Sequence, residues 1–347
     1  MLNLLLRRCV LRAVWLSVAF WPVAQAPVVA APAEAAPVPV QTVPDEVALA
    51  MRVGDFAALE RLYARYGQRG VVSELTGTPR VGHFWNGISQ ISKYSLRVTD
   101  AYFIQLDALT AQWVERNPRV LLAHLLHADA LNTHAWAYRG GGFAKSVPAA
   151  AWSQFEKYNE RAYQVLRRAE PLAAEDSSWN FLMLRVGRAM GWSVDRSWAV
   201  FENGVGKNPN HDGLYEEMLN SVLPKWGGDL RLVDRVIAHA VKSTRAERGL
   251  ALYASLYGMV SYAELEQSLF TASLASWPSM RTGFEDLIKR YPHSDHRNKF
   301  AYFACMANDR ETLRVQLALM EGAFEPRFWG DHPERTYDGC RALAGNA

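Results

Sequence analysis

The sequence lacks the residue patterns that define the common classes of enzyme. Its 347 residues contain no His-Glu-x-x-His pattern, no Gly-x-Ser-x-Gly, no phosphate-binding loop, and no Ser-x-x-Lys with its companion motifs. The three glycines from Gly140 to Gly142 follow no expected strand, so they indicate a hinge at residues 140–147 rather than a phosphate cradle. We therefore assign no catalytic residue, no metal and no cofactor, and enzymatic activity stays an open alternative.

The sequence also has little net charge. The chain has 38 basic and 35 acidic side chains, a net charge of +3. Arg7, Arg8, Arg12 and Glu34 lie close to the N-terminus, and without them 35 basic and 34 acidic residues remain. No Lys/Arg run is left to neutralise phosphate groups, so we expect no nucleic-acid partner.

Strand patterns are nearly absent, because β-branched residues are sparse and only short stretches alternate apolar with polar residues. Amphipathic segments of about 12 to 22 residues instead alternate with short Gly, Pro or Asn turns. This pattern predicts an all-α solenoid of stacked antiparallel helical hairpins. The expected helices are residues 45–53, 55–66, 100–116, 118–138, 148–169, 177–190, 194–207, 213–223, 230–242, 246–257, 263–275, 278–290, 295–307 and 310–321, with residues 68–97 only partly helical.

A degenerate repeat supports the hairpin pattern. An aromatic residue precedes a helix-ending proline by eight positions in three places, Tyr163 and Pro171, Phe201 and Pro209, and Phe284 and Pro292. This spacing is typical of tetratricopeptide repeats, in which the aromatic residue packs into the hairpin and the proline stops the second helix. We therefore expect Phe201 and Phe284 to be structural anchors.

Three short phrases also resemble a known family. They are Ala135 to Gly140, Leu223 to Gly228, and Phe300 to Cys305 followed by Asn308 and Asp309. Together they resemble an uncharacterised family of bacterial proteins with tetratricopeptide-like architecture, known only as a domain of unknown function. The similarity extends from about residue 45 to residue 343 and implies a helical-repeat fold. It implies no mechanism.

The N-terminal residues predict export. The basic residues Arg7, Arg8 and Arg12 precede an apolar run from Ala13 to Ala24, and small residues follow it. We expect a signal peptide at residues 1–30, a Pro/Ala-rich tether at 31–44 and a helical-repeat domain at 45–347. The expected location is the periplasm or the exterior of the cell, with an uncleaved membrane anchor or an organellar transit peptide as alternatives.

Histidine and acidic residues gather on one expected helix, which contains His124, His127, Asp129 and His134. The first and last histidines are ten positions apart, about 15 Å along a helix, so one metal ion cannot bind all three. Helix packing or a groove face is the preferred interpretation. In later turns Asp295, with His293 and His296, and Asp212, with His211, are expected to cap helices.

Tryptophan concentrates in the middle third of the chain, and we expect about two-thirds of these residues to be buried. The remainder could line a concave binding face, as in other solenoids. The candidate groove consists of Trp136, Tyr138, Arg139 and Trp152, in which the Arg139 guanidinium either caps carbonyl groups or faces a ligand carboxylate. Trp136 and Trp226 are also expected to wedge between hairpins as structural anchors.

These patterns favour an exported, non-catalytic module that binds a peptide, a protein or a cell-wall component. One alternative is an envelope hydrolase acting on glycan or peptide, for which Glu74 is the single candidate acid that we identify. Another alternative is a structural subunit of an envelope assembly.

A disulfide is expected between Cys305 and Cys340, the two cysteines that remain after removal of the signal. An oxidising compartment favours their pairing. The competing interpretation is two separate buried cysteines.

Overall fold

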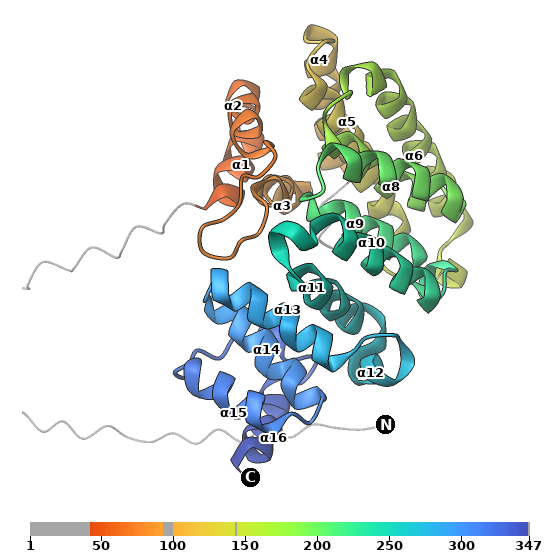
Figure 1. The fold of residues 1–347 in the computed structure, drawn as a ribbon. Coiled ribbons are helices and arrows are strands. Elements are labelled where there is room, and N and C mark those ends of the chain that lie inside the picture. Colours follow the sequence, from red (N-terminus) through yellow and green to blue (C-terminus); the bar gives the residue numbers. More distant parts are fainter. Residues whose placement is uncertain (1–41, 93–99, 143, 346–347) are drawn as a thin grey trace, which may run out of the picture. The chain divides into compact units, whose positions relative to one another are not determined.

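Helices joined by short turns form the described part of the chain, residues 42–92, 100–142 and 144–345 (Figure 1). In this computed structural model the first eight α-helices are Val43–Arg52 (α1), Phe56–Tyr66 (α2), Arg80–Ser92 (α3), Asp100–Arg116 (α4), Leu121–Arg139 (α5), Ala149–Ala169 (α6), Ser177–Ala189 (α7) and Val194–Lys207 (α8). The others are Asp212–Val222 (α9), Leu230–Arg248 (α10), Ala251–Val260 (α11), Leu269–Ala272 (α12), Trp277–Arg290 (α13), Ser294–Met306 (α14), Arg310–Leu319 (α15) and Pro333–Gly345 (α16). The β pairing within these ranges is a single isolated bridge between Val72 and Pro79. The all-α prediction is confirmed.

The predicted signal peptide, residues 1–30, and the predicted tether up to residue 41 lie outside the described residues. Helix α1 begins at Val43, two residues before its predicted start. Thr42 caps it: the Thr42 Oγ1 accepts the Asp45 N–H at 3.4 Å, and the Asp45 carboxylate accepts the Thr42 N–H at 3.2 Å. Pro44 therefore belongs to the first helical turn, where its missing N–H is tolerated.

Helix α5 is packed by α4, α6 and α7. Every residue from Leu122 to Asn132 is buried, although this stretch includes His124, His127 and Asp129. Buried polar side chains need hydrogen-bond partners, so α5 is tied to its neighbours by specific polar contacts as well as by apolar packing. The C-terminal end of α5 is less buried, and this end contributes to the candidate site.

Two helix predictions in the second half are wrong. The break expected between residues 242 and 246 is absent, because α10 continues to Arg248 and ends at Gly249, whose φ is +60°. The helix expected at residues 263–275 is instead a π-helical turn at Ser261–Leu265, a 3₁₀ turn at Glu266–Ser268 and the short α12. The Ser261 Oγ donates to the Glu266 carbonyl at 2.8 Å, a side-chain bond that competes with regular helix formation.

The expected cap of α14 is also corrected. The His293 Nδ1 accepts the Asp295 N–H at 3.2 Å, whereas the Asp295 carboxylate accepts a hydrogen bond from the Arg327 Nη2 at 2.8 Å. Likewise Asp212 does not cap α9, because its carboxylate accepts a hydrogen bond from the Arg248 Nη2 at 3.0 Å. Both aspartates form ion pairs with arginines from other segments.

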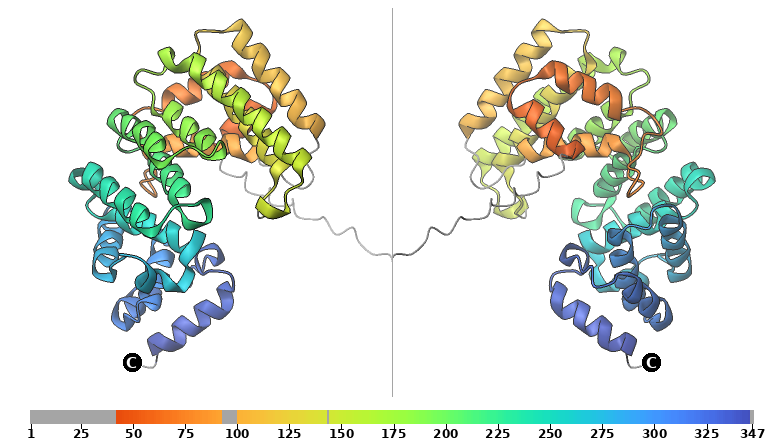
Figure 2. Two further views of the ribbon diagram at one scale, coloured as in Figure 1. Left: turned by 90° about the vertical axis from the view of Figure 1, so that its right-hand side faces the viewer. Right: turned by 90° about the vertical axis from the view of Figure 1, so that its left-hand side faces the viewer.

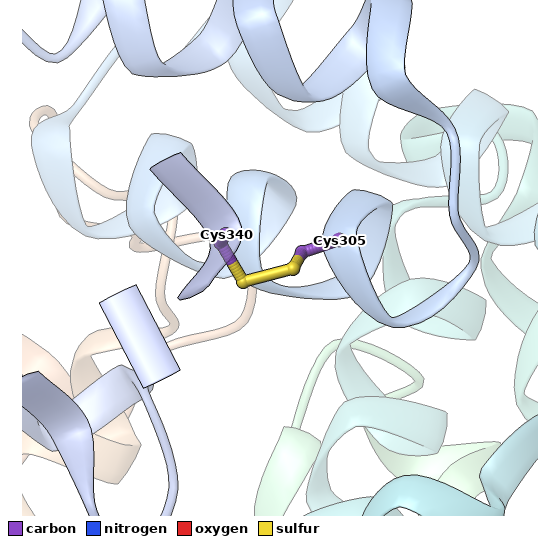
Figure 3. Close-up of a disulfide and its surroundings, with 2 residues drawn as sticks. All are labelled: Cys305 and Cys340. Carbon is purple, nitrogen blue, oxygen red and sulfur yellow. A yellow bond between two sulfur atoms is a disulfide. The ribbon is translucent and has the colours of Figure 1, made fainter. Parts of the chain in front are cut away.

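The C-terminal segment is more ordered than its turn-rich sequence predicts. Helix α16 packs against α14 and α15, and the fully buried Trp329 lies against Tyr337 of α16 at 4.8 Å between ring centroids. The predicted disulfide is confirmed: Cys305 of α14 and Cys340 of α16 are bonded, with their Cα atoms 5.6 Å apart (Figure 3). The bridge joins α16 to the helix on which it rests.

Helices that are adjacent in the sequence mostly lie side by side, as the pairs α4 and α5, α5 and α6, α7 and α8, and α14 and α15 show (Figure 2). None of the helices in the described ranges combines the length and the apolar character needed to cross a membrane. The packing of α5, α6 and α7 brings the C-terminal ends of α5 and α7 close to the first half of α6, and the 3₁₀ turn Pro224–Trp226 joins them at one cavity.

Candidate functional site

A cavity of about 870 Å³ lies where these four segments meet. We call it the Trp–Arg cavity, because its wall contains Trp136, Arg139, Trp152, Arg188 and Trp226. Phe155 and Met190 add apolar surface to the same wall. Its size and lining are those of a site for a small ligand or a short peptide segment.

The three tryptophan rings surround the Arg139 guanidinium. The Arg139 Cζ lies 5.2 Å from the Trp136 centroid and 5.5 Å from each of the Trp152 and Trp226 centroids. The Arg139 Nη1 donates to the carbonyl oxygens of Gly140, at 2.9 Å, and Gly142, at 3.0 Å. Of the two roles that the sequence leaves open, capping of carbonyl groups is therefore the one observed, and it holds the glycine turn against the end of α5.

Arg188 contacts the same rings from α7. Its Cζ lies 5.5 Å from the Trp136 centroid and 5.3 Å from the Trp226 centroid. Its Nη2 donates to the Glu217 Oε2 at 3.2 Å, but its buried Nε has no hydrogen-bond partner among the described residues. A buried charged donor without a partner is costly, and an acceptor on a ligand would satisfy it.

Arg188 belongs to a buried network of ion pairs with Glu217, Arg185 and Asp129. The Arg185 Nε donates to Glu217 at 3.0 Å, and the Arg185 Nη1 donates to Asp129 at 2.9 Å. Burial by itself lowers the pKa of Arg185. The carboxylates of Glu217 and Asp129 raise it by a larger amount, so the pKa of Arg185 lies above its ordinary value. Burial raises the pKa of Glu217, and the guanidinium groups of Arg185 and Arg188 lower it to a net value below the ordinary one. Burial raises the pKa of Asp129 as well, and there it outweighs the opposing effect of Arg185, so Glu217 is the carboxylate that the two guanidinium groups hold most firmly in its ionised form.

Charge is distributed unevenly around the Trp–Arg cavity. Arg139 and Lys225 hydrogen-bond to backbone carbonyl groups, and the structure gives neither an acidic partner among the described residues. Glu156 and Glu160 of α6 lie on the same lining. The cavity thus presents both signs of charge beside aromatic surface, which suits a ligand that itself contains both.

The predicted site residues fall into two groups. Trp136, Arg139 and Trp152 line the cavity as expected, whereas Tyr138 does not. The Tyr138 hydroxyl donates to Asp100 at 2.6 Å, and its ring stacks on His134, so Tyr138 belongs to the packing of α5 against α4.

The residues predicted to be structural anchors differ in how deeply they are buried. Phe201 and Phe284 are almost completely buried, at 0% and 1% exposed. Trp226 is 38% exposed and lines the cavity, so its ring is only partly packed between helices, and its role as a structural anchor stays a prediction. Of the six tryptophans between residues 136 and 226, Trp179 and Trp198 are buried, which is fewer than the expected two-thirds. Each of the other four has an arginine guanidinium over its ring.

The histidine cluster of α5 is structural. The His124 Nε2 contacts the Pro118 carbonyl at 2.9 Å, the His127 Nδ1 contacts the Thr110 Oγ1 at 2.9 Å, and the His134 Nε2 contacts Asp100 at 2.7 Å. Burial lowers the pKa of His127 to about 4. No group of three or more His, Cys, Asp or Glu side chains in the described ranges could hold a metal ion.

Comparison with known proteins adds no assignment. No protein-family model matches the chain, and no curated protein matches it.

Proposed function

We propose that this protein is a non-catalytic binding module of the cell envelope, and that its Trp–Arg cavity holds a short peptide segment through a carboxylate group. The observation that carries the proposal is the buried Arg188 Nε, which has no partner within the described residues and lies beside two tryptophan rings of a cavity of about 870 Å³. The Arg188 Nη2 already binds Glu217, so the Nε is the Arg188 donor that an acceptor on the ligand would satisfy.

A peptide fits the cavity better than a sugar does. Guanidinium groups lie over Trp136 and Trp226, so the faces on which a sugar ring would stack are already covered. A peptide offers a carboxylate for the arginine side, an apolar side chain for Phe155 and Met190, and a basic group for Glu156. These three features are the recognition elements that we assign to the ligand.

The architecture and location belong to the same proposal. The side-by-side packing of consecutive helices supports a solenoid of degenerate tetratricopeptide-like hairpins, which typically bind peptides in a groove. The N-terminal sequence pattern supports export to the periplasm or the cell exterior. The hydrolase alternative has no comparable support, because Glu74 is exposed in a turn and lines neither the Trp–Arg cavity nor its neighbours.

The test uses the full-length protein and a random hexapeptide pool with free C-terminal carboxylates. Peptides retained by the protein are identified by mass spectrometry, and selected ones are synthesised both as acids and as C-terminal amides. We expect amidation to weaken binding by at least about tenfold, because a charge-assisted hydrogen bond contributes about 1.5 to 3 kcal/mol.

Two variants complete the test. Trp226→Ala removes a partly exposed ring and should weaken binding while the thermal midpoint changes little. Arg168→Met, an exposed arginine on α6 outside the cavity lining, is the matched control and should bind like the parent. Equal binding of the acids and amides, or unchanged binding by Trp226→Ala, would refute the assignment.

A further inference from the structure

A second cavity, of about 600 Å³, is lined mainly by helices from the C-terminal half of the chain. Helices α9, α10, α11, α13 and α14 contribute to it, together with residues 76–78, the π-helical turn Ser261–Leu265 and the 3₁₀ turn Pro326–Phe328. Its apolar lining includes Met259, Phe284, Leu287, Phe303 and Phe328. Its charged lining consists of Asp212, Glu216, Arg248, His296, Lys299 and Arg327.

Most of these charged groups are already paired within the protein. Arg248 binds Asp212, with Nη2 to Oδ2 at 3.0 Å, and Arg327 binds Asp295 at 2.8 Å. The His296 Nε2 contacts the Thr76 carbonyl at 3.0 Å. Burial lowers the pKa of His296 to about 4, so its ring is neutral at physiological pH and donates from Nε2.

Lys299 and Glu216 are the exceptions. The described residues provide neither a hydrogen bond nor an ion pair to the Lys299 ammonium, which lies 4.8 Å from the Phe328 ring centroid. They likewise provide no hydrogen bond or ion pair to the Glu216 carboxyl group. Both side chains line the same cavity, and each influences the pKa of the other.

The electrostatic surroundings of Glu216 favour its protonated form. Burial raises the pKa of Glu216 to about 7, with additional contributions from the negative charges of Asp212 and Glu217. Lys299 and Arg185 act in the opposite direction. Glu216 is exposed to solvent where it lines the cavity, and the neighbouring carboxylates of Asp212 and Glu217 favour its neutral form there. Arg248, His296 and Arg327 complete the charged and titratable lining.

We propose that this cavity binds a small carboxylic acid with an apolar body, whose carboxylate lies between Lys299 and Glu216 while the apolar part packs against Met259 and Phe303. Among the described residues that line this cavity, the Lys299 ammonium is the one positive charge without an acidic partner, which matches a monoanion. A dianion such as phosphate would face the carboxylate of Asp212 without a second unpaired cation from this described lining, and a cationic ligand would be repelled by Lys299.

Protonated Glu216 donates a hydrogen bond to the bound carboxylate, so binding is coupled to pH. The ligand anion raises the Glu216 pKa further, because it interacts favourably with the protonated form and repels the ionised one. Affinity is therefore constant from about pH 7 down to the range near pH 4 to 5 in which a carboxylic acid itself becomes protonated, and above pH 7 it weakens by up to about tenfold per pH unit, as expected for one proton. Binding at pH 8 takes up close to one proton.

The test probe is 3-phenylpropanoate, with 3-phenylpropanamide as its uncharged counterpart. Isothermal titration calorimetry with the full-length protein, in two buffers of different ionisation enthalpy, measures both affinity and proton uptake. We expect binding of the acid at pH 6, at least tenfold weaker binding of the amide, and about one proton taken up at pH 8. A hexapeptide that ends in Phe distinguishes a peptide C-terminus from a free small acid as the source of the carboxylate.

Substitutions of Lys299 and Glu216 test the role of each side chain in binding. Lys299→Met should weaken binding at least tenfold, and Glu216→Gln should bind without the pH dependence because the amide still donates. Lys289→Met, an exposed lysine of α13 outside the cavity lining, is the control and should bind like the parent. The inference is overturned if neither the acid nor the peptide binds at pH 6, if the amide binds as tightly as the acid, or if Lys299→Met has no effect. Because the amide comparison uses the unaltered protein, it stands even if a variant unfolds.

Discussion

At the scale of single residues, Arg185 stabilises the fold through two ion pairs with buried carboxylates. It lies between the carboxylates of Asp129, which is 3% exposed, and Glu217, which is 7% exposed. Removal of one partner from a buried ion pair typically costs about 3 to 5 kcal/mol, because the remaining charge is left without compensation. We therefore expect Arg185→Met to lower the free energy of unfolding by about this amount in urea denaturation.

The control for this prediction is Arg231→Ala. Arg231 pairs with Asp229 on the surface, and its side chain is 91% exposed. Solvent screens such a pair, so the denaturation midpoint of Arg231→Ala should match that of the parent. Similar midpoints for Arg185→Met and Arg231→Ala would show that the buried network contributes little.

The Trp–Arg cavity was predictable in part from single residues. Trp136 and Arg139 precede three glycines at the end of a helix, and this local pattern marks an accessible helix end. Arg188 was not predictable, because its place beside Trp226 depends on the packing of α7 against a turn 38 positions later in the sequence. Tyr138 lies between Trp136 and Arg139 in the sequence. Its hydroxyl nevertheless donates to Asp100, on another face of α5.

At the scale of elements, the disulfide is expected to hold α16 in place. It closes a loop of 35 residues, for which the chain-entropy account gives a stabilisation of about 3 to 4 kcal/mol. Trp329 and Tyr337 also pack in this segment, so the helix should loosen rather than leave the fold when the bridge is absent. We expect Cys305→Ala/Cys340→Ala to lower the melting temperature and to speed amide hydrogen exchange in residues 333–345.

The same exchange experiment contains an internal control. Helix α8 lies in a different part of the sequence and has no contact with the disulfide, so its exchange should remain at the parent rate. Uniform acceleration across α8 and α16 would indicate global destabilisation instead of local loosening. Unchanged exchange in α16 would show that apolar packing alone fixes the helix.

Element boundaries followed from the sequence where a local signal sets them. Helices α4 and α8 have the predicted bounds, and α8 is preceded by its N-cap Ser193, whose Oγ accepts the Arg196 N–H at 3.3 Å. Helix α10 extends past its predicted end through Thr244, whose side chain is buried and whose hydroxyl is satisfied by donation to the Ala240 carbonyl at 2.8 Å inside the helix. Tertiary burial thus overrides the polar pattern that indicated a break.

At the scale of the whole molecule, buried histidines connect segments that are far apart in the sequence. His127 contacts Thr110, His211 contacts Ser177 at 2.9 Å, and His296 contacts the Thr76 carbonyl. Burial lowers the pKa of His211 to about 3 and those of His127 and His296 to about 4. These histidines are therefore neutral in the folded state over a pH range in which the unfolded chain binds protons.

This difference predicts a stability that falls as the solution becomes acidic. Below about pH 6.5 the unfolded state takes up a proton at each of these histidines, and each lowers the free energy of unfolding by about 1.4 kcal/mol per pH unit until its folded pKa is reached. Glu216 has a raised pKa and acts in the opposite sense between its ordinary value and about 7, so it offsets part of the loss. We expect the melting temperature to drop progressively from pH 6.5 to pH 4.5.

Melting curves of two histidine variants, recorded at several pH values, can show whether buried histidines cause this dependence of stability on pH. His211→Asn keeps an acceptor for the Ser177 hydroxyl but cannot titrate, so the stability of this variant should depend less steeply on pH by one proton. His332→Gln removes an exposed histidine and should keep the parent slope. The decisive comparison is between the slopes and not the absolute midpoints, because His211→Asn also changes packing at every pH. A flat parent curve from pH 6.5 to 4.5, or equal slopes for His211→Asn and His332→Gln, would mean that buried histidines do not set the acid sensitivity of the fold.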